Sequence, residues 1–476
     1  MKPATLTSYD DADVGARTDA HVSALNIAGR MERLPLSRFH WTLFAILGVA
    51  MFFDGYDLTV TGFVIPALHK HGWLTPATTA TFISVPLIAA AFGSIAAGLL
   101  GDRIGRRRLF QATVLAYSLS SLGCGFATSY GMLLTFRTLN LFAIGTVTVT
   151  GYAYLNEFTP RRYRGRFQSA VALLLNGGLP FGALMARLIV PNTDVNVGWR
   201  VLFLLSVIPA LLVFANKRLL PESPRWLASV GRDEEAARVV DSIEAGIVQR
   251  EGKTLPDAEL TREPARHLGW DALFSPLVRG RFALAVVFNI CHLTGLFVLI
   301  SWLPTLFVSR GLTLGSTFTF AAVSFMGGFL GPLLGIVLAD RIERRWSLMA
   351  AALIAACAGV AYAGQTSPQG LMITGLILVT AIFFISSVGF ATYIPEILPT
   401  GVRLRGLGTA ALIGRLASAA TPFAVAAALL TLKNPFYVVS SVGVAYVVMA
   451  LLLAVLGPNV RGRTLESLES GLNTKS

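Results

Sequence analysis

The chain has 476 residues, of which 54% are hydrophobic and only 14% are charged, and its mean hydropathy is +0.65. A soluble protein of this length would carry about a quarter charged residues. The composition therefore excludes an ordinary soluble domain. It indicates apolar runs long enough to cross a ~30 Å hydrocarbon core as helices.

The net charge of +13 could suggest a nucleic-acid partner, but the placement of the cations argues against one. The arginines cluster at the ends of alternate apolar runs, and the intervening loops carry few cations. This alternation is the positive-inside pattern, so we expect both termini to be cytoplasmic and no nucleic-acid partner. The clusters fall within residues 103–108, 161–166, 341–345, 403–405 and 461–463.

The order of apolar and polar segments predicts an all-α membrane protein with twelve transmembrane helices in two six-helix halves. Residues 1–40 form a polar cytoplasmic segment without the basic-then-apolar order of a cleaved signal peptide. Between residues 41 and 220, six helices are predicted at about 42–68, 79–100, 109–127, 131–156, 167–190 and 199–219. Residues 221–280 indicate a cytoplasmic linker with one or two surface helices. Between residues 281 and 457, six more are predicted at about 282–309, 315–339, 347–364, 371–393, 404–431 and 436–456, before a polar tail at 458–476.

Three cysteines, Cys124, Cys291 and Cys357, all lie inside apolar runs. No pair has disulfide-framework or metal-ligand spacing, so we expect free thiols that act as small packing residues. The linker carries no phosphate-binding glycine motif, and it is short for a catalytic domain. We therefore expect no metal, no cofactor and no enzymatic activity.

A basic loop joins the second and third apolar runs. Its glycines allow a tight turn and close helix approach, and its arginines hold it on the cytoplasmic side. The pattern resembles the signature loop of the major facilitator superfamily, and the resemblance implies a secondary transporter. It consists of Gly98, Asp102, Arg103, Gly105, Arg106 and Arg107.

The second half of the chain repeats charged positions of the first half at a spacing close to half the chain. Glu343 replaces the loop glycine and Ile336 replaces Gly98, so the second loop is the weaker copy. A parallel repeat of six helices, with a pathway between the halves, is the architecture expected of such a transporter. The matching pairs are Asp102 and Asp340, Arg103 and Arg341, Glu157 and Glu396, and Arg164 and Arg403.

Segments at helix ends narrow the resemblance to one branch of the superfamily. The segment around Glu222 and Arg225, and residues 462–466 after the last helix, are similar to sugar-porter signatures. Acid and arginine pairs at the cytoplasmic helix ends are predicted to latch the halves in one conformation; the alternative is that they only anchor helix ends. The predicted latch comprises the loop residues named above with Glu157, Arg164, Glu222, Arg225, Asp340, Arg341, Glu396 and Arg403.

The first helix contains Asp54 and Asp57, less than one turn apart. A carboxylate at bilayer depth is costly, so it faces the protein interior or carries a proton. We predict that Asp54 or Asp57 is the proton-coupling site, the alternative being a structural pair bonded to a neighbouring helix. The surrounding segment resembles the aromatic-acid:proton symporters and the nicotinate-type organic-acid carriers.

Two arginines, Arg137 and Arg415, fall within predicted membrane helices. Either can bind a substrate carboxylate through two parallel hydrogen bonds, and either can instead pair with a helix-one aspartate. Other candidates for substrate binding are polar or aromatic residues at membrane depth, each of which can also be a packing residue. They are Tyr56, Asn176, Asn289, His292, Phe384 and Tyr393.

Taken with the resemblance, these residues predict proton-coupled uptake of a small organic anion by alternating access, with an aromatic monocarboxylate as the leading substrate class. A sugar or polyol porter is the close alternative. A drug:proton antiporter and a non-transporting nutrient sensor are further alternatives. We expect a monomer in a bacterial-type inner membrane, with a small-molecule substrate, protons and lipid as its partners.

Overall fold

The computed structural model describes residues 26–194, 197–215, 219–252, 254–257, 271–276, 278–309, 313–338, 341–365, 367–398, 403–432 and 435–459. Every predicted apolar run is helical in this part of the chain. Nine of the described helical segments are long and apolar enough to cross a membrane. They are Arg38–Lys70, Ala77–Ile104, Tyr130–Phe158, Arg162–Asn192, Arg279–Ile300, Gly315–Leu338, Arg344–Gly364, Pro368–Ile397 and Gly406–Ala427.

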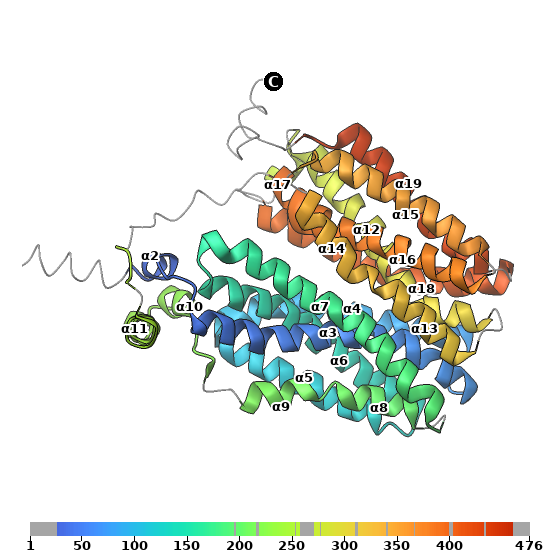
Figure 1. Ribbon diagram of the computed structural model, residues 1–476, viewed down its shortest axis with the longest axis horizontal. Helices are drawn as coiled ribbons and strands as arrows, with labels where there is room; N and C mark the ends of the chain where they lie inside the picture. The colour runs from blue at the N-terminus through green and yellow to red at the C-terminus, as the bar shows by residue number, and fades with distance from the viewer. Residues whose placement is uncertain are drawn as a thin grey trace, which may run out of the picture.

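The helices form two groups that lie side by side (Figure 1). The first group contains α3 (Arg38–Lys70), α4 (Pro76–Ile104), α5 (Arg106–Gly125), α6 (Tyr130–Phe158), α7 (Arg161–Ile189), η1 (Val190–Asn192), α8 (Gly198–Leu205) and α9 (Ile208–Ala215). The second contains α12 (Arg279–Ser309), α13 (Leu314–Phe325), α14 (Gly327–Leu338), α15 (Arg344–Gly364), α16 (Pro368–Phe384), η4 (Ile385–Tyr393), α17 (Ile394–Ile397), α18 (Arg403–Leu432) and α19 (Pro435–Leu456).

Three short elements and one longer helix lie outside these groups: α2 (Ile27–Glu32), α10 (Pro224–Ser229), α11 (Asp233–Glu251) and η3 (Asp271–Phe274). Helices α2, α10 and α11 gather at one end of the first group, which we call the linker end (Figure 1). The linker helices predicted from the polar composition of residues 221–280 are thus present as α10 and α11.

Three predicted spans are not single straight α-helices. The sixth is divided into α8 and α9 at Ser206, and the eighth into α13 and α14 at Met326. The tenth continues from α16 as the π-helical segment η4. Sequence periodicity cannot locate such breaks, because a helix that is apolar all round gives the same pattern on both sides of them. Short π-helical segments often occur at functional sites.

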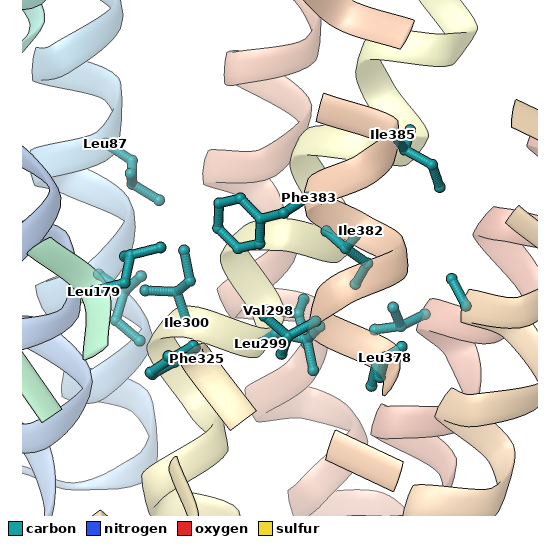
Figure 2. Packing of buried hydrophobic residues seen from close by; sticks show 14 of the residues in the cluster. Leu87, Leu179, Val298, Leu299, Ile300, Phe325, Leu378, Ile382, Phe383 and Ile385 are labelled. Carbon is teal, nitrogen blue, oxygen red and sulfur yellow. The ribbon is translucent and has the colours of Figure 1, made fainter. Parts of the chain in front are cut away.

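The two groups share a buried hydrophobic cluster (Figure 2). Leu87 and Leu179 of the first group belong to it together with Ile300 and Phe325 of the second. Further contacts between the groups occur away from the linker end. The ring of Phe63 meets that of Phe318 at 5.0 Å between centroids.

Glycines set the separation of α3 and α7. A Cβ atom at Gly178 would lie 2.1 Å from the backbone oxygen of Phe52 and 2.3 Å from the backbone nitrogen of Tyr56. Neither backbone atom can move without separating the helices. The glycines in the sequence Asn-Gly-Gly-Leu-Pro at residues 176–180 therefore allow α3 to pack closely against α7.

We expect Gly178→Ala to lower the thermal stability of the purified protein. Forcing a methyl group against backbone atoms costs about 1–3 kcal/mol, whereas alanine at an unhindered helix position is favourable. Gly165→Ala, near the start of the same helix with nothing within 4 Å of its added methyl, is the matched control. The unfolding temperatures of the two variants, measured in detergent, test this expectation. Equal temperatures for the two variants would contradict the close approach.

Candidate functional site

The first feature of the site is an ion pair inside the first group of helices. Arg137 of α6 donates from Nη1 to Asp57 Oδ2 of α3 at 2.5 Å, and from Nη2 to the Asp57 backbone oxygen at 3.0 Å. The side chains of Arg137 and Asp57 are 1% and 0% exposed. Of the two roles considered for Arg137, the structure places it as the partner of a helix-one aspartate.

The surroundings of this pair satisfy most of its remaining hydrogen-bonding capacity. Arg137 Nη1 also donates to Asn140 Oδ1 at 2.8 Å, and Nη2 donates to Thr61 Oγ1 at 2.5 Å. Ser206, at the break between α8 and α9, donates to Asp57 Oδ1 at 3.3 Å. The guanidinium also lies over the ring of Phe203. Removing one partner of such a buried pair would leave the other charge buried and uncompensated.

Asp54 has a different environment, although it lies on the same helix. It is the seventeenth of 33 residues in α3 and is 3% exposed. In the part of the chain that the structure describes, its side-chain hydrogen bond comes from Thr148 of α6, at 2.6 Å to Oδ2. Asp54 is therefore a carboxyl group at mid-helix depth whose hydrogen-bond partner is a neutral hydroxyl.

Arg415 connects Asp54 to the second group of helices. It extends from α18, donates from Nη1 to the Ser94 hydroxyl on α4, and interacts electrostatically with Asp54. Ser94 itself donates to backbone oxygens of Ala90 and Gly145. Arg415 is half-buried. The described chain thus brings an aspartate and an arginine from different groups close together without a salt bridge between them.

The second group supplies Asn289 and His292, both on α12 and both 2% exposed. His292 Nε2 lies 2.8 Å from the Ser386 hydroxyl of η4, and its ring contacts those of Phe288 and Phe390, at 6.1 and 6.5 Å between centroids. Asn289 packs against Gly414, the neighbour of Arg415, where an added Cβ would come within 3.0 Å of it. These two polar residues therefore lie beside the helix that carries Arg415.

The other substrate-binding candidates lie in packed surroundings. Tyr56 donates its hydroxyl to the Leu202 backbone oxygen, and Tyr393 donates to that of Pro458. Both rings are fully buried. Phe384 is buried at the end of α16, and Asn176 of α7 faces Gly328 of α14 across the two groups. Of these four, Asn176 is the one that lies at the boundary between the groups.

The predicted latch residues pair within each group of helices. Arg106 donates to Glu157 at 2.9 Å and to Asp102 at 2.9 Å. Gly105 adopts a φ of 92°, and a Cβ there would lie 2.5 Å from Glu222, so the turn requires glycine. Glu222 accepts from the backbone N–H of Arg107 at 2.9 Å. In the second group, Arg344 pairs with Glu396.

The remaining latch residues have less structural support. A Cβ at Gly98 would have no atom within 4 Å, and Arg103 and Arg341 are exposed. Asp340 and the side chain of Arg403 lie outside the described residues. The structure therefore places the predicted loop turn beside Glu157 of the first group and Glu222 of the linker.

Glu32 is a residue that the sequence analysis missed. It lies on α2 and accepts from Arg225 at 2.7 Å and from Arg164 at 3.1 Å, both predicted latch residues. Arg30 of α2 and Arg33, which follows the last residue of α2, bind Glu244 of α11 at 2.6 and 2.8 Å. The hydrogen bond with Glu244 raises the pKa of Arg30 above its ordinary value. Helix α2 thus ties the linker helices to the first group.

Similarity to known proteins agrees with this architecture. Residues 41–472 match the protein family described as "Sugar (and other) transporter". The putative metabolite transport protein YdjK of Escherichia coli strain K12 is 31% identical over 92% of this chain and 96% of its own length. The niacin transporter NiaP of Acinetobacter baylyi is 29% identical over 93% of this chain and 100% of its own.

Among solved structures, the inward open conformation of the E. coli xylose transporter XylE superposes with a TM-score of 0.71. It is 18% identical and covers 90% of this chain and 99% of its own. That likeness shows the fold, and the family match over residues 41–472 shows the kind of protein. The chain belongs to the sugar (and other) transporter family of the major facilitator superfamily and is a multi-pass membrane transporter, not an enzyme.

Proposed function

We propose that the protein takes up a small organic anion, an aromatic or related monocarboxylate, together with a proton. The observation that carries this proposal is the placement of Asp54 and Arg415 together at the boundary between the helix groups, each hydrogen-bonded to a hydroxyl. NiaP, whose name assigns it niacin, an aromatic monocarboxylate, supports the substrate class.

The proposed topology has twelve membrane helices, six at residues 41–220 and six at 281–457. Residues 1–40, the linker at 221–280 and the tail at 458–476 are then cytoplasmic, in a bacterial-type inner membrane. The arginine clusters at 103–108 and 161–166 support this orientation, because Arg107 and Arg164 contact Glu222 and Glu32 at the linker end. Each chain is proposed to work as a monomer.

Charge balance at the boundary couples the proton to the substrate. In the empty transporter an ionised Asp54 balances Arg415. In the loaded transporter a proton neutralises Asp54, and the substrate carboxylate balances Arg415. Either ligand alone leaves one uncompensated charge at bilayer depth, which costs about 2.5–3.5 kcal/mol on insertion scales. Only the empty and doubly loaded forms can then change orientation readily, and that is symport.

The Asp57–Arg137 pair has a supporting role in this proposal. Its partners from α3, α6 and the α8–α9 break hold three parts of the first group together. The pair therefore fixes the helix that presents Asp54. The charged pairs at the linker end are proposed to favour one orientation of the transporter by holding each group's helix ends together.

We expect Arg415→Ala to weaken binding of a monocarboxylate such as nicotinate by at least tenfold. Hydrogen bonds to a charged group contribute about 1.5–3 kcal/mol, and alanine removes both the charge and the donors. Ser94→Ala, which removes the hydroxyl partner but keeps the guanidinium, should leave affinity within about threefold, because a neutral partner contributes about 1 kcal/mol or less.

Calorimetric titration of purified protein with nicotinate and benzoate measures these affinities. An Arg415→Ala variant that bound both acids as tightly as the unchanged protein would remove Arg415 from the substrate site. Tight binding of a hexose, with no carboxylate binding, would instead support the sugar-porter alternative, which the family description favours.

A further inference from the structure

Helix α12 presents a buried hydrogen-bond acceptor that has no partner in the described chain. Asn289 donates from Nδ2 to the Ala285 backbone oxygen at 2.8 Å, which identifies the other amide atom as the oxygen Oδ1. Oδ1 is buried and receives no hydrogen bond from any described residue. Buried polar atoms are nearly always satisfied, so such an oxygen at bilayer depth indicates a missing donor.

One turn further along α12, His292 presents a second unfilled position. Ser386 directs its hydroxyl toward the Ile382 backbone oxygen of its own helix, at 3.3 Å. The hydroxyl oxygen also lies 2.8 Å from His292 Nε2, in a hydrogen bond whose direction depends on the histidine tautomer. Nδ1 is also buried without a partner among the described residues. Asn289 and His292 are three residues apart and share one face of α12.

The internal repeat relates this face to the proposed proton site. The offset of 238 residues that relates Asp102 to Asp340 also relates Asp54 to His292. The offset of 239 residues that relates Glu157 to Glu396 also relates Asn176 to Arg415. The two halves thus contribute polar side chains from equivalent helices at equivalent depths, as expected of a site formed between repeats.

Resting on the proposed function, we infer that the substrate is a hydroxylated carboxylate. Its carboxylate binds Arg415, and its hydroxyl group donates to Asn289 Oδ1, beside the unpartnered Nδ1 of His292. Arg415 can only donate hydrogen bonds, whereas Asn289 Oδ1 can only accept them. A ligand that satisfies both ends must therefore carry an anionic acceptor at one end and an O–H or N–H donor at the other.

Two pairs of acids that differ in hydroxyl groups test this inference. Benzoate and 4-hydroxybenzoate form the planar pair; cyclohexanecarboxylate and 3,4,5-trihydroxycyclohexanecarboxylate form the saturated pair. Affinities are measured by titration of the purified, full-length protein in detergent. We expect the hydroxylated member of at least one pair to bind about tenfold or more tightly than its partner, since an unfilled buried acceptor strongly disfavours the analogue. The pair that shows the preference identifies the ring type.

Asn289→Leu removes the acceptor and should reduce that preference to about twofold or less, with the affinity of the unhydroxylated acid nearly unchanged. Asn192→Leu is the matched control, because Asn192 makes the same bond to a backbone oxygen four residues earlier but is exposed at the end of η1. It should keep the full preference. His292→Leu offers a second variant should Asn289→Leu fail to fold.

Equal affinities within both pairs, or an Asn289→Leu variant that keeps the preference, would overturn the inference and leave the proposed uptake of organic anions intact. Failure of nicotinate and all four acids to bind would overturn both. Because these are binding measurements without a membrane, they do not depend on a proton gradient, and a failure of proton-driven transport would leave their result unchanged.

Discussion

Asp54→Asn is expected to abolish proton-driven accumulation of substrate while preserving exchange of substrate across the membrane. Asparagine keeps the size of the side chain and its bond with Thr148 but cannot take up a proton or balance Arg415. The loaded variant is neutral at the boundary, so it can still change orientation. The empty variant carries an unbalanced Arg415 charge, and a penalty of about 2.5–3.5 kcal/mol slows its return roughly 100-fold.

Proteoliposomes separate these two activities. Net uptake under an inward proton gradient requires the empty transporter to return, whereas counterflow from a substrate-filled vesicle does not. We expect Asp54→Asn to show counterflow near the level of the unchanged protein and almost no net uptake. Thr148→Val, which keeps the carboxyl group but removes its hydroxyl partner, is the control and should retain uptake. Full net uptake by Asp54→Asn would mean that another group carries the coupled proton.

Arg137→Leu is expected to have the largest effect on stability. It leaves the fully buried Asp57 carboxylate without its cation, and breaking a buried pair in this way costs about 3–5 kcal/mol. Replacing both partners, as in Asp57→Asn with Arg137→Leu, removes the unpaired charge and should recover a large part of that loss. Recovery by the second substitution is what distinguishes charge imbalance from simple loss of packing.

Unfolding temperatures of the single and double variants in detergent test this expectation. Arg187→Leu is the control, because Arg187 donates to Thr319 from a half-buried position and leaves no buried carboxylate behind. A double variant no more stable than Arg137→Leu would mean that the guanidinium stabilises the fold through its contacts with Thr61 and Phe203 rather than through Asp57.

The sequence predicted the helices and the family because both depend on local signals. Runs of about twenty apolar residues and arginines at alternate ends identify membrane helices without knowledge of their packing. The turn at Gly105 was also predictable, because the loop between two apolar runs is short and glycine tolerates a turn that a Cβ atom would block. The structure adds the reason: Glu222 occupies the space that a side chain at residue 105 would need.

The partners of the charged residues were not predictable, because they depend on which helices lie side by side. Arg137 and Arg415 were equivalent candidates in the sequence, yet one pairs with Asp57 inside the first group and the other reaches Ser94 across the groups. Glu32 is about 130 residues from Arg164 and about 190 from Arg225. No local sequence pattern indicates such contacts. A helix of six residues, such as α2, is also too short to show a recognisable hydrophobic periodicity.

The most direct test of the proposed coupling is substrate accumulation by proteoliposomes under a pH gradient alone and under a membrane potential alone. Charge balance between Asp54 and Arg415 predicts that one proton and one monocarboxylate cross together without net charge. A pH gradient, acidic outside, should therefore drive accumulation of a labelled monocarboxylate, and a membrane potential without a pH gradient should not. Accumulation driven by the potential alone, or accumulation of a neutral hexose in place of the acid, would contradict the account.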